Sequence, residues 1–218
     1  MDPYEKIDEM CNRLIESESS QRISARIKLY SSGVKAKLRN AEYALSQIID
    51  LYNESDSTSS SDDQDFSVTN KLFFYVDSFF AFLYSTFDVM SQVINQKKRI
   101  GEDERKVSFK GIKGKLDQSN QLKNLFERIS NKRYFRNLEK YRNCSTHRRQ
   151  IYIQSITVII SETPDYNVTG DITKVRRIIC DDPFSLNPTI DQDRELIKCC
   201  TNILNKVKSE IINISDNI

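Results

Sequence analysis

Hydrophobic residues recur at helical spacing through the first quarter of the chain. Between residues 22 and 50 they follow one another at gaps of three and four, at Ile23, Ile27, Tyr30, Val34, Leu38, Ala41, Leu45 and Ile48. Such gaps place side chains on one face of an α-helix. The pattern predicts a long amphipathic helix over 22–50 and a shorter helix over 4–16.

Two polar stretches interrupt this helical pattern. Residues 53–65 consist almost entirely of Ser, Thr, Asp, Glu and Gln. That composition cannot bury apolar area, so it predicts a mobile acidic loop inside one core rather than a domain boundary. Residues 97–118 are basic, contain three glycines and show no sustained period, which predicts a second loop.

The segment 67–98 between these loops is rich in Phe and Tyr. Polar residues interrupt its apolar stretch, so we expect a buried central helix rather than a bilayer span. Asp77, Tyr84 and Asp88 are spaced at i, i+7 and i+11, which places them within about 20° of one another on a helix. Two carboxylates on a buried face would need cationic partners from another helix. Periodicity alone also allows this stripe to face water.

The remaining chain mixes helical and strand patterns. Residues 120–129 and 132–148 read as helices, and 190–214 reads as a C-terminal helix. Between them, 151–180 carries two β-branched runs separated by Pro, Asp, Asn and Gly, which is typical of a β-hairpin. We therefore predict a mainly α protein, a helical bundle with a small β-hairpin insertion before the C-terminal helix. The chain is expected to form a single domain over 1–218, with its helical core at 20–150.

Composition excludes several classes of protein. The chain has 218 residues, 38% of them hydrophobic, with 5 Gly and 4 Pro, which excludes collagen-like and wholly disordered chains. Five cysteines and the lack of a signal-peptide pattern favour a cytoplasmic location. No Cys-x-x-Cys pair is present and there is one histidine, so we expect no metal site of the usual Cys/His type and no cofactor.

Charge is distributed unevenly along the chain. The formal net charge is +2 overall, but it is −6 over residues 1–96, +11 over 97–149 and −3 over 150–218. A strongly basic middle third is typical of a surface that binds a polymeric anion such as RNA. The same residues could also serve as a solvated helix face with a basic loop.

The sharpest local motif lies in this basic third. It is the run from Arg142 to His147, Arg-Asn-Cys-Ser-Thr-His, and it contains the only histidine of the chain. The spacing alone carries little weight because arginine is common here. A purely structural alternative is that His147 ends a helix, where a cation favours the C-terminal dipole, while Arg142 faces water.

Together with the Phe-rich helix before it, this motif resembles the hallmark of the HEPN superfamily. That hallmark is Arg, four to six residues, then His, often with a polar residue after the Arg, and the match here is Arg142, Asn143 and His147. The segment from Phe73 to Asp88 is similar to the second helix of uncharacterised bacterial HEPN proteins of the Cthe_2314 type. The resemblance covers roughly residues 20–150.

The resemblance implies a metal-independent endoribonuclease with a role as a toxin or in phage defence. Arg142 and His147 would be catalytic and Asn143 would support them. A histidine titrates near neutral pH, and a guanidinium fork matches phosphate oxygens. Supporting polar residues would be Asp77, Asp88 and Tyr84, and RNA would be held by the basic region, in particular by Arg136, Lys140, Arg148 and Arg149.

The resemblance also implies partners other than RNA. Arg142 and His147 are five residues apart, about 140° around a helix, so one subunit would carry an incomplete site. HEPN proteins pair their motif helices across a two-fold axis, which implies a homodimer. A cognate antitoxin or nucleotidyltransferase could control a toxic member, and no membrane is expected. The alternative function is a catalytically silent HEPN-like module that binds RNA or a protein partner.

Overall fold

The computed structural model of this protein describes residues 2–57, 62–117, 120–147, 153–160, 172–179 and 195–218. In chain order its elements are α1 (Pro3–Glu16), α2 (Gln21–Ser57), α3 (Asp62–Lys97), α4 (Phe109–Lys115), α5 (Gln121–Asn131), α6 (Arg133–His147), β1 (Ile153–Ile160), β2 (Ile172–Ile179) and α7 (Leu196–Asn217). The described part of the chain is therefore mainly helical, as predicted.

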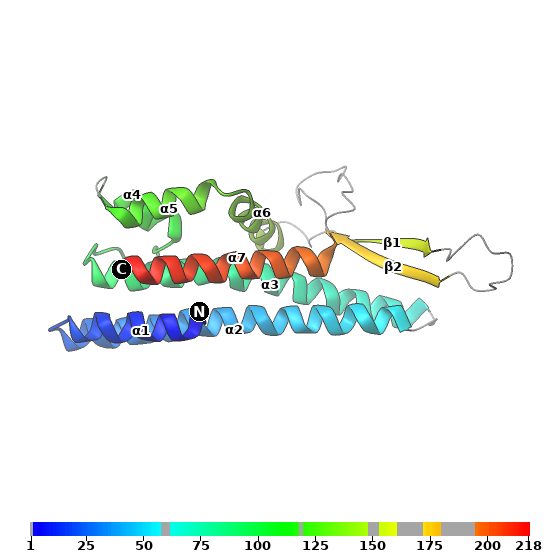
Figure 1. Cartoon of the computed structure of the whole chain (residues 1–218), viewed down its shortest axis with the longest axis horizontal. Coiled ribbons are helices and arrows are strands. Elements are labelled where there is room, and N and C mark those ends of the chain that lie inside the picture. Colours follow the sequence, from blue (N-terminus) through cyan, green and yellow to red (C-terminus); the bar gives the residue numbers. More distant parts are fainter. Residues whose placement is uncertain (1, 58–61, 118–119, 148–152, 161–171, 180–194) are drawn as a thin grey trace.

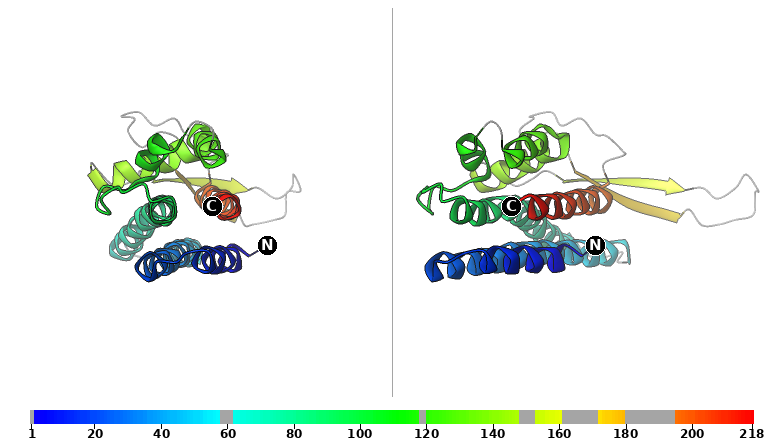
Figure 2. Two further views of the ribbon diagram at one scale, coloured as in Figure 1. Left: turned by 90° about the vertical axis from the view of Figure 1, so that its left-hand side faces the viewer. Right: turned by 60° about the vertical axis from the view of Figure 1, so that its left-hand side comes forward.

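The helices stack in three layers. Figures 1 and 2 show α1 and α2 on one side, α3 and α7 in the middle, and α4, α5 and α6 on the other side. Helices α2 and α3 approach closely where Gly33 faces Val89, because a Cβ at residue 33 would lie 3.0 Å from a Val89 methyl. This close packing explains why a glycine interrupts an otherwise regular helical pattern.

An aromatic cluster joins the middle layer to the upper one. The rings of Phe109 and Phe126 stack with centroids 4.2 Å apart. Phe135 lies 5.1 Å from Phe87 and 5.0 Å from Phe109. These four side chains are at most 1% exposed and come from α3, α4, α5 and α6. The cluster therefore sets where α6 lies relative to α3.

The strands β1 and β2 form an antiparallel pair that projects from one end of the bundle (Figure 1). Ile153 lies opposite Ile179, and Ile160 lies opposite Ile172. Ile179 is buried and Ile153 packs against the main core, so the base of the pair is anchored to the bundle. Residues 161–171 and 180–194 are outside the described part.

Helix α3 passes a length-and-composition test for a membrane span over Val68–Lys97. The core helix of a soluble protein passes the same test, so the match by itself is weak. In this structure Phe79, Phe80, Phe87 and Val93 are fully buried in the main hydrophobic core. These contacts support the prediction of a buried central helix.

The prediction of a loop over 53–65 was wrong at both ends. Helix α2 continues to Ser57 and α3 begins at Asp62, with residues 58–61 outside the described part. A helix already nucleated can extend through polar residues, since each added residue gains a backbone hydrogen bond. Acidic residues at the start of α3 also favour its positive N-terminal dipole.

The predicted loop over 97–118 was also wrong in part, because it contains α4. The hydroxyl of Ser108 caps this short helix by accepting a hydrogen bond from the Gly111 amide at 3.1 Å. Phe109 and Ile112 are both fully buried on one face of α4. Seven residues are too few to show a helical period in the sequence. The helix forms here because its apolar face is buried against α3 and α5.

Candidate functional site

Helix α6 carries the Arg-Asn-x3-His motif. Its inward face packs Phe135, Leu138, Tyr141 and Cys144 into the core, as the periodicity predicts. The ring of Tyr141 stacks on Phe80 of α3 with centroids 4.4 Å apart. The helix ends at His147, whose side chain is outside the described part of the structure. The second half of α6 is thus held directly against α3.

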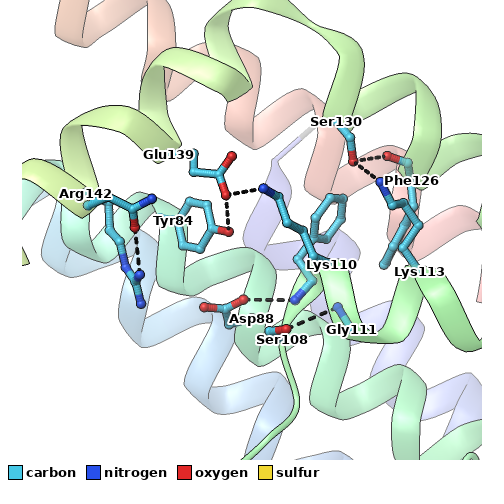
Figure 3. Close-up of polar contacts among 12 residues, drawn as sticks. Tyr84, Asp88, Ser108, Lys110, Gly111, Lys113, Phe126, Ser130, Glu139 and Arg142 are labelled. Carbon is cyan, nitrogen blue, oxygen red and sulfur yellow. Dashed lines mark hydrogen bonds and ion pairs between the residues drawn. The ribbon is translucent and has the colours of Figure 1, made fainter. Parts of the chain in front are cut away.

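Arg142 is half-buried and is oriented by contacts on two sides (Figure 3). Its guanidinium carbon lies 5.1 Å from the centre of the Tyr84 ring, a cation–π contact. Its Nη1 donates a hydrogen bond of 2.9 Å to Oδ1 of Asn143. The two residues of the motif are therefore in direct contact, and α3 supplies the surface on which the guanidinium rests.

Asp88 connects α3 to the beginning of α4. Its Oδ1 accepts a hydrogen bond of 2.9 Å from the backbone amide of Phe109, the first residue of α4. Burial raises the pKa of the Asp88 carboxyl, while the Phe109 amide and the charge of Arg142 oppose that rise. The polar stripe at Tyr84 and Asp88 thus faces other helices rather than water, and α6 supplies a cation.

Glu139 and Lys110 complete the cluster, and neither residue was among those predicted for the site. Lys110 forms an ion pair of 2.5 Å with Glu139, and the Tyr84 hydroxyl donates a long hydrogen bond of 3.4 Å to the same carboxylate. Glu139 precedes Arg142 by three residues on α6, a spacing that could have indicated it. Lys110 gave no such signal, because α4 was expected to be loop.

The cluster consists of two carboxylates, two cations and one phenol. Burial together with the charges of Asp88 and Glu139 raises the pKa of Tyr84, so its hydroxyl stays protonated near neutral pH and can only donate or accept hydrogen bonds. The described residues contain no group of three or more His, Cys, Asp or Glu that could hold a metal ion. What this arrangement offers is a guanidinium held in a defined orientation.

The other predicted site residues are distributed differently. Asp77 is half-buried on α3, about 16 Å along the helix axis from Asp88 at 1.5 Å per residue. Arg136 is exposed and Lys140 half-buried on α6. Arg148 and Arg149 lie outside the described residues. The structure therefore brings together Arg142, Asn143, Tyr84 and Asp88.

Two substitutions at Asp88 separate its hydrogen bond from its charge. Asn at this position keeps an oxygen for the Phe109 amide, whereas Ala leaves that amide without its acceptor. We expect Asp88→Ala to be less stable than Asp88→Asn by about 1–3 kcal/mol at pH 7, measured by urea unfolding.

The contribution of the Asp88 carboxyl to the stability of the fold depends on pH, and the sign of this dependence is defined. A carboxyl whose pKa is raised in the folded state stabilises the fold below its unfolded pKa, and this contribution is lost as the pH rises through the folded value. Asp88→Asn lacks this loss, so its stability relative to the wild type should increase between pH 4 and pH 7. Equal destabilisation by Asn and Ala at pH 7 would contradict this role of Asp88.

Comparison with known proteins gives one match. A sequence model described as Cthe2314-like HEPN matches residues 9–210. No curated protein and no solved structure matches the chain. The match covers most of the chain, including the motif on α6 and the polar cluster around it. The chain therefore belongs to the Cthe2314-like HEPN family.

Proposed function

We propose that this protein is a metal-independent endoribonuclease in which Arg142 and His147 are catalytic and Asn143 supports them. The observation that carries the proposal is the contact geometry of the motif in a chain of the HEPN family: Arg142 rests on Tyr84 and is hydrogen-bonded to Asn143. A guanidinium held in this way needs little reorganisation to meet a charged transition state.

The chemistry requires few groups. The ribose 2′-hydroxyl attacks the adjacent phosphorus, the bond to the 5′-oxygen breaks, and a 2′,3′-cyclic phosphate and a 5′-hydroxyl remain. His147 would transfer a proton, because an imidazole titrates near neutral pH. Arg142 would stabilise the additional negative charge on the phosphorane oxygens. Asn143 would keep the guanidinium in place.

A homodimer is part of the proposal. Arg142 and His147 are separated by about 140° around an ideal helix, so a single α6 does not present both to one phosphate. Two copies of α6 meeting across a two-fold axis would supply both groups to one cleft. RNA would be held by Arg136, Lys140, Arg148 and Arg149. We further propose a cytoplasmic toxin or phage-defence effector, controlled by an antitoxin or nucleotidyltransferase.

The test is cleavage of a mixed-sequence RNA in the presence of EDTA. We expect fragments ending in 2′,3′-cyclic phosphate, and a rate unaffected by the chelator. An RNA of the same sequence with 2′-O-methyl groups should remain intact, because the attacking hydroxyl is blocked. Cleavage of the methylated strand, or loss of activity in EDTA, would contradict the proposed chemistry. The oligomeric state of the same sample, measured by light scattering, tests the dimer.

A second function is favoured by one feature of the site. Arg142 is half-buried, and its contact with Tyr84 also serves to pack α6 on α3, while Asn143 holds the guanidinium from within α6. A purely structural arginine would make the same contacts. The alternative is therefore a catalytically silent HEPN module that binds RNA or a protein partner. A well-folded protein that binds the unmodified RNA without cutting it would support this alternative.

A further inference from the structure

A basic groove lies between α6 and α7. It has a volume of about 220 Å³ and is lined by Arg133, Tyr134 and Asn137 of α6 and by residues of α7 that include Lys198, Asn202 and Lys206. Among the residues that the structure describes, none of those lining the groove is Asp or Glu. Arg133 and Arg142 are nine residues apart, about 180° around the helix, so the groove is on the opposite face of α6 from the motif arginine.

The helical spacing explains why these side chains line one groove. Lys198, Asn202 and Lys206 are spaced at i, i+4 and i+8, which forms one stripe on α7. Arg133 and Asn137 are spaced at i and i+4 on α6. Arg133, Lys198, Asn202 and Lys206 are all exposed. The groove therefore presents cations and amides from two facing stripes to solvent.

Tyr134 supplies the aromatic part of the groove lining. It lines the groove and is 9% exposed, and its hydroxyl is buried without a hydrogen-bond partner among the described residues. The Lys206 ammonium lies 5.7 Å from the Tyr134 ring centre, which holds this cation over the aromatic floor.

The basic surface continues along α6 beyond the groove. Arg133, Arg136, Asn137 and Lys140 are spaced at i, i+3, i+4 and i+7, so they share one face of the helix. This face extends toward the end of α6 at His147, about 21 Å from Arg133 at 1.5 Å per residue. A strand of a few nucleotides could span that length.

We propose that the groove binds backbone phosphates of an RNA strand and holds that strand on α6 away from the site of cleavage. The cations that line the groove, Lys198, Lys206 and Arg133, attract phosphate, and the two amides can donate hydrogen bonds to phosphate or base oxygens. The identification of RNA rests on the proposed function. The groove itself follows from the position of α7 beside α6, since residues of both helices line it.

The test measures binding separately from cleavage. The probe is a fluorescein-labelled, mixed-sequence 2′-O-methyl RNA 20-mer, which cannot be cut by 2′-hydroxyl attack. Binding to wild type and to Lys198→Ala/Lys206→Ala is followed by fluorescence anisotropy over a range of salt concentrations. The matched control is Lys28→Ala/Lys71→Ala, which removes the same charge from two exposed lysines outside both the groove and the basic region 97–149.

Loss of two phosphate contacts has a calculable effect. Each contact to a single strand contributes about 0.7 to the salt slope, or about five-fold in affinity at 0.1 M salt. We expect the groove variant to bind about 25-fold more weakly, with its salt slope smaller by about 1.4, and the control variant to bind nearly as wild type. Equal losses in both variants, or no loss in either, would overturn the proposal.

Two further arms distinguish the possible outcomes. Competition by inorganic phosphate or by a mononucleotide at micromolar concentration would show that the groove takes a free phosphate compound, which would overturn the assignment to an RNA strand. Cleavage of unmodified RNA without groove-dependent binding would refute this inference and leave the proposed function intact. Groove-dependent binding without cleavage would support the inference while the proposed function fails.

Discussion

Replacing His147 by alanine is expected to lower the rate of RNA cleavage by about 10²–10⁴-fold, the usual contribution of a general acid or base. His147 is the only histidine of the chain, and no other side chain type titrates near pH 7 without perturbation. The measurement is the rate of formation of cyclic-phosphate ends in EDTA at pH 7, with circular dichroism to show that the helical content is unchanged.

A lysine at residue 147 separates catalysis from helix stabilisation. Helix α6 ends at His147, where any cation interacts favourably with the helix dipole, by about 0.3–1 kcal/mol. His147→Lys retains a cation at this position but does not exchange a proton readily near neutral pH. We expect it to be as inactive as His147→Ala and at least as stable as the wild type. Wild-type cleavage by the lysine variant would show that the histidine only caps the helix.

Replacing Phe135 by alanine should give the largest loss of stability, about 3–5 kcal/mol. Its ring is 1% exposed and lies within 5.1 Å of the rings of Phe87 and Phe109. It also lies 5.8 Å from Tyr84, on which Arg142 rests. Removing it leaves a cavity where α3, α4 and α6 meet. Urea unfolding measures the change in the free energy of unfolding.

The matched control is an exposed phenylalanine on α3. Phe74 is 65% exposed, so Phe74→Ala should change the free energy of unfolding by less than about 0.5 kcal/mol. The loss of stability in Phe135→Leu should lie between the losses in Phe135→Ala and Phe74→Ala, because leucine fills part of the cavity. A loss below about 1 kcal/mol in Phe135→Ala would mean that the aromatic cluster does not hold α6 on α3.

The helices with a strong local period could be predicted, and those decided by tertiary contacts could not. The regular gaps from Ile23 to Ile48 predicted the central part of α2 and the face of this helix that is buried. The same reasoning missed α4, whose Phe109 and Ile112 show too short a pattern to reveal a period. It also ended α2 too early, because polar composition was taken as a sign of a loop although helix propagation continued to Ser57.

The candidate site was predictable in its helical part. Stripe geometry predicted that Tyr84 and Asp88 lie together and need a cation from another helix. Arg142 of α6 contacts Tyr84, and its charge offsets part of the rise that burial causes in the pKa of Asp88. Asp77 was grouped with them by angle alone. Angle around a helix takes no account of distance along it, so only the tertiary structure decides which members of a stripe meet the same partner.

The sequence by itself determined the helical class of this protein, the motif on α6 and the family resemblance that the motif carries. The tertiary structure decided which charges meet. Counting along the chain assigned −3 to residues 150–218, yet Lys198 and Lys206 of that segment line a basic groove with Arg133. Helical periodicity relates residues three or four positions apart, whereas an interhelical groove depends on packing between segments more than sixty residues apart, which no local pattern records.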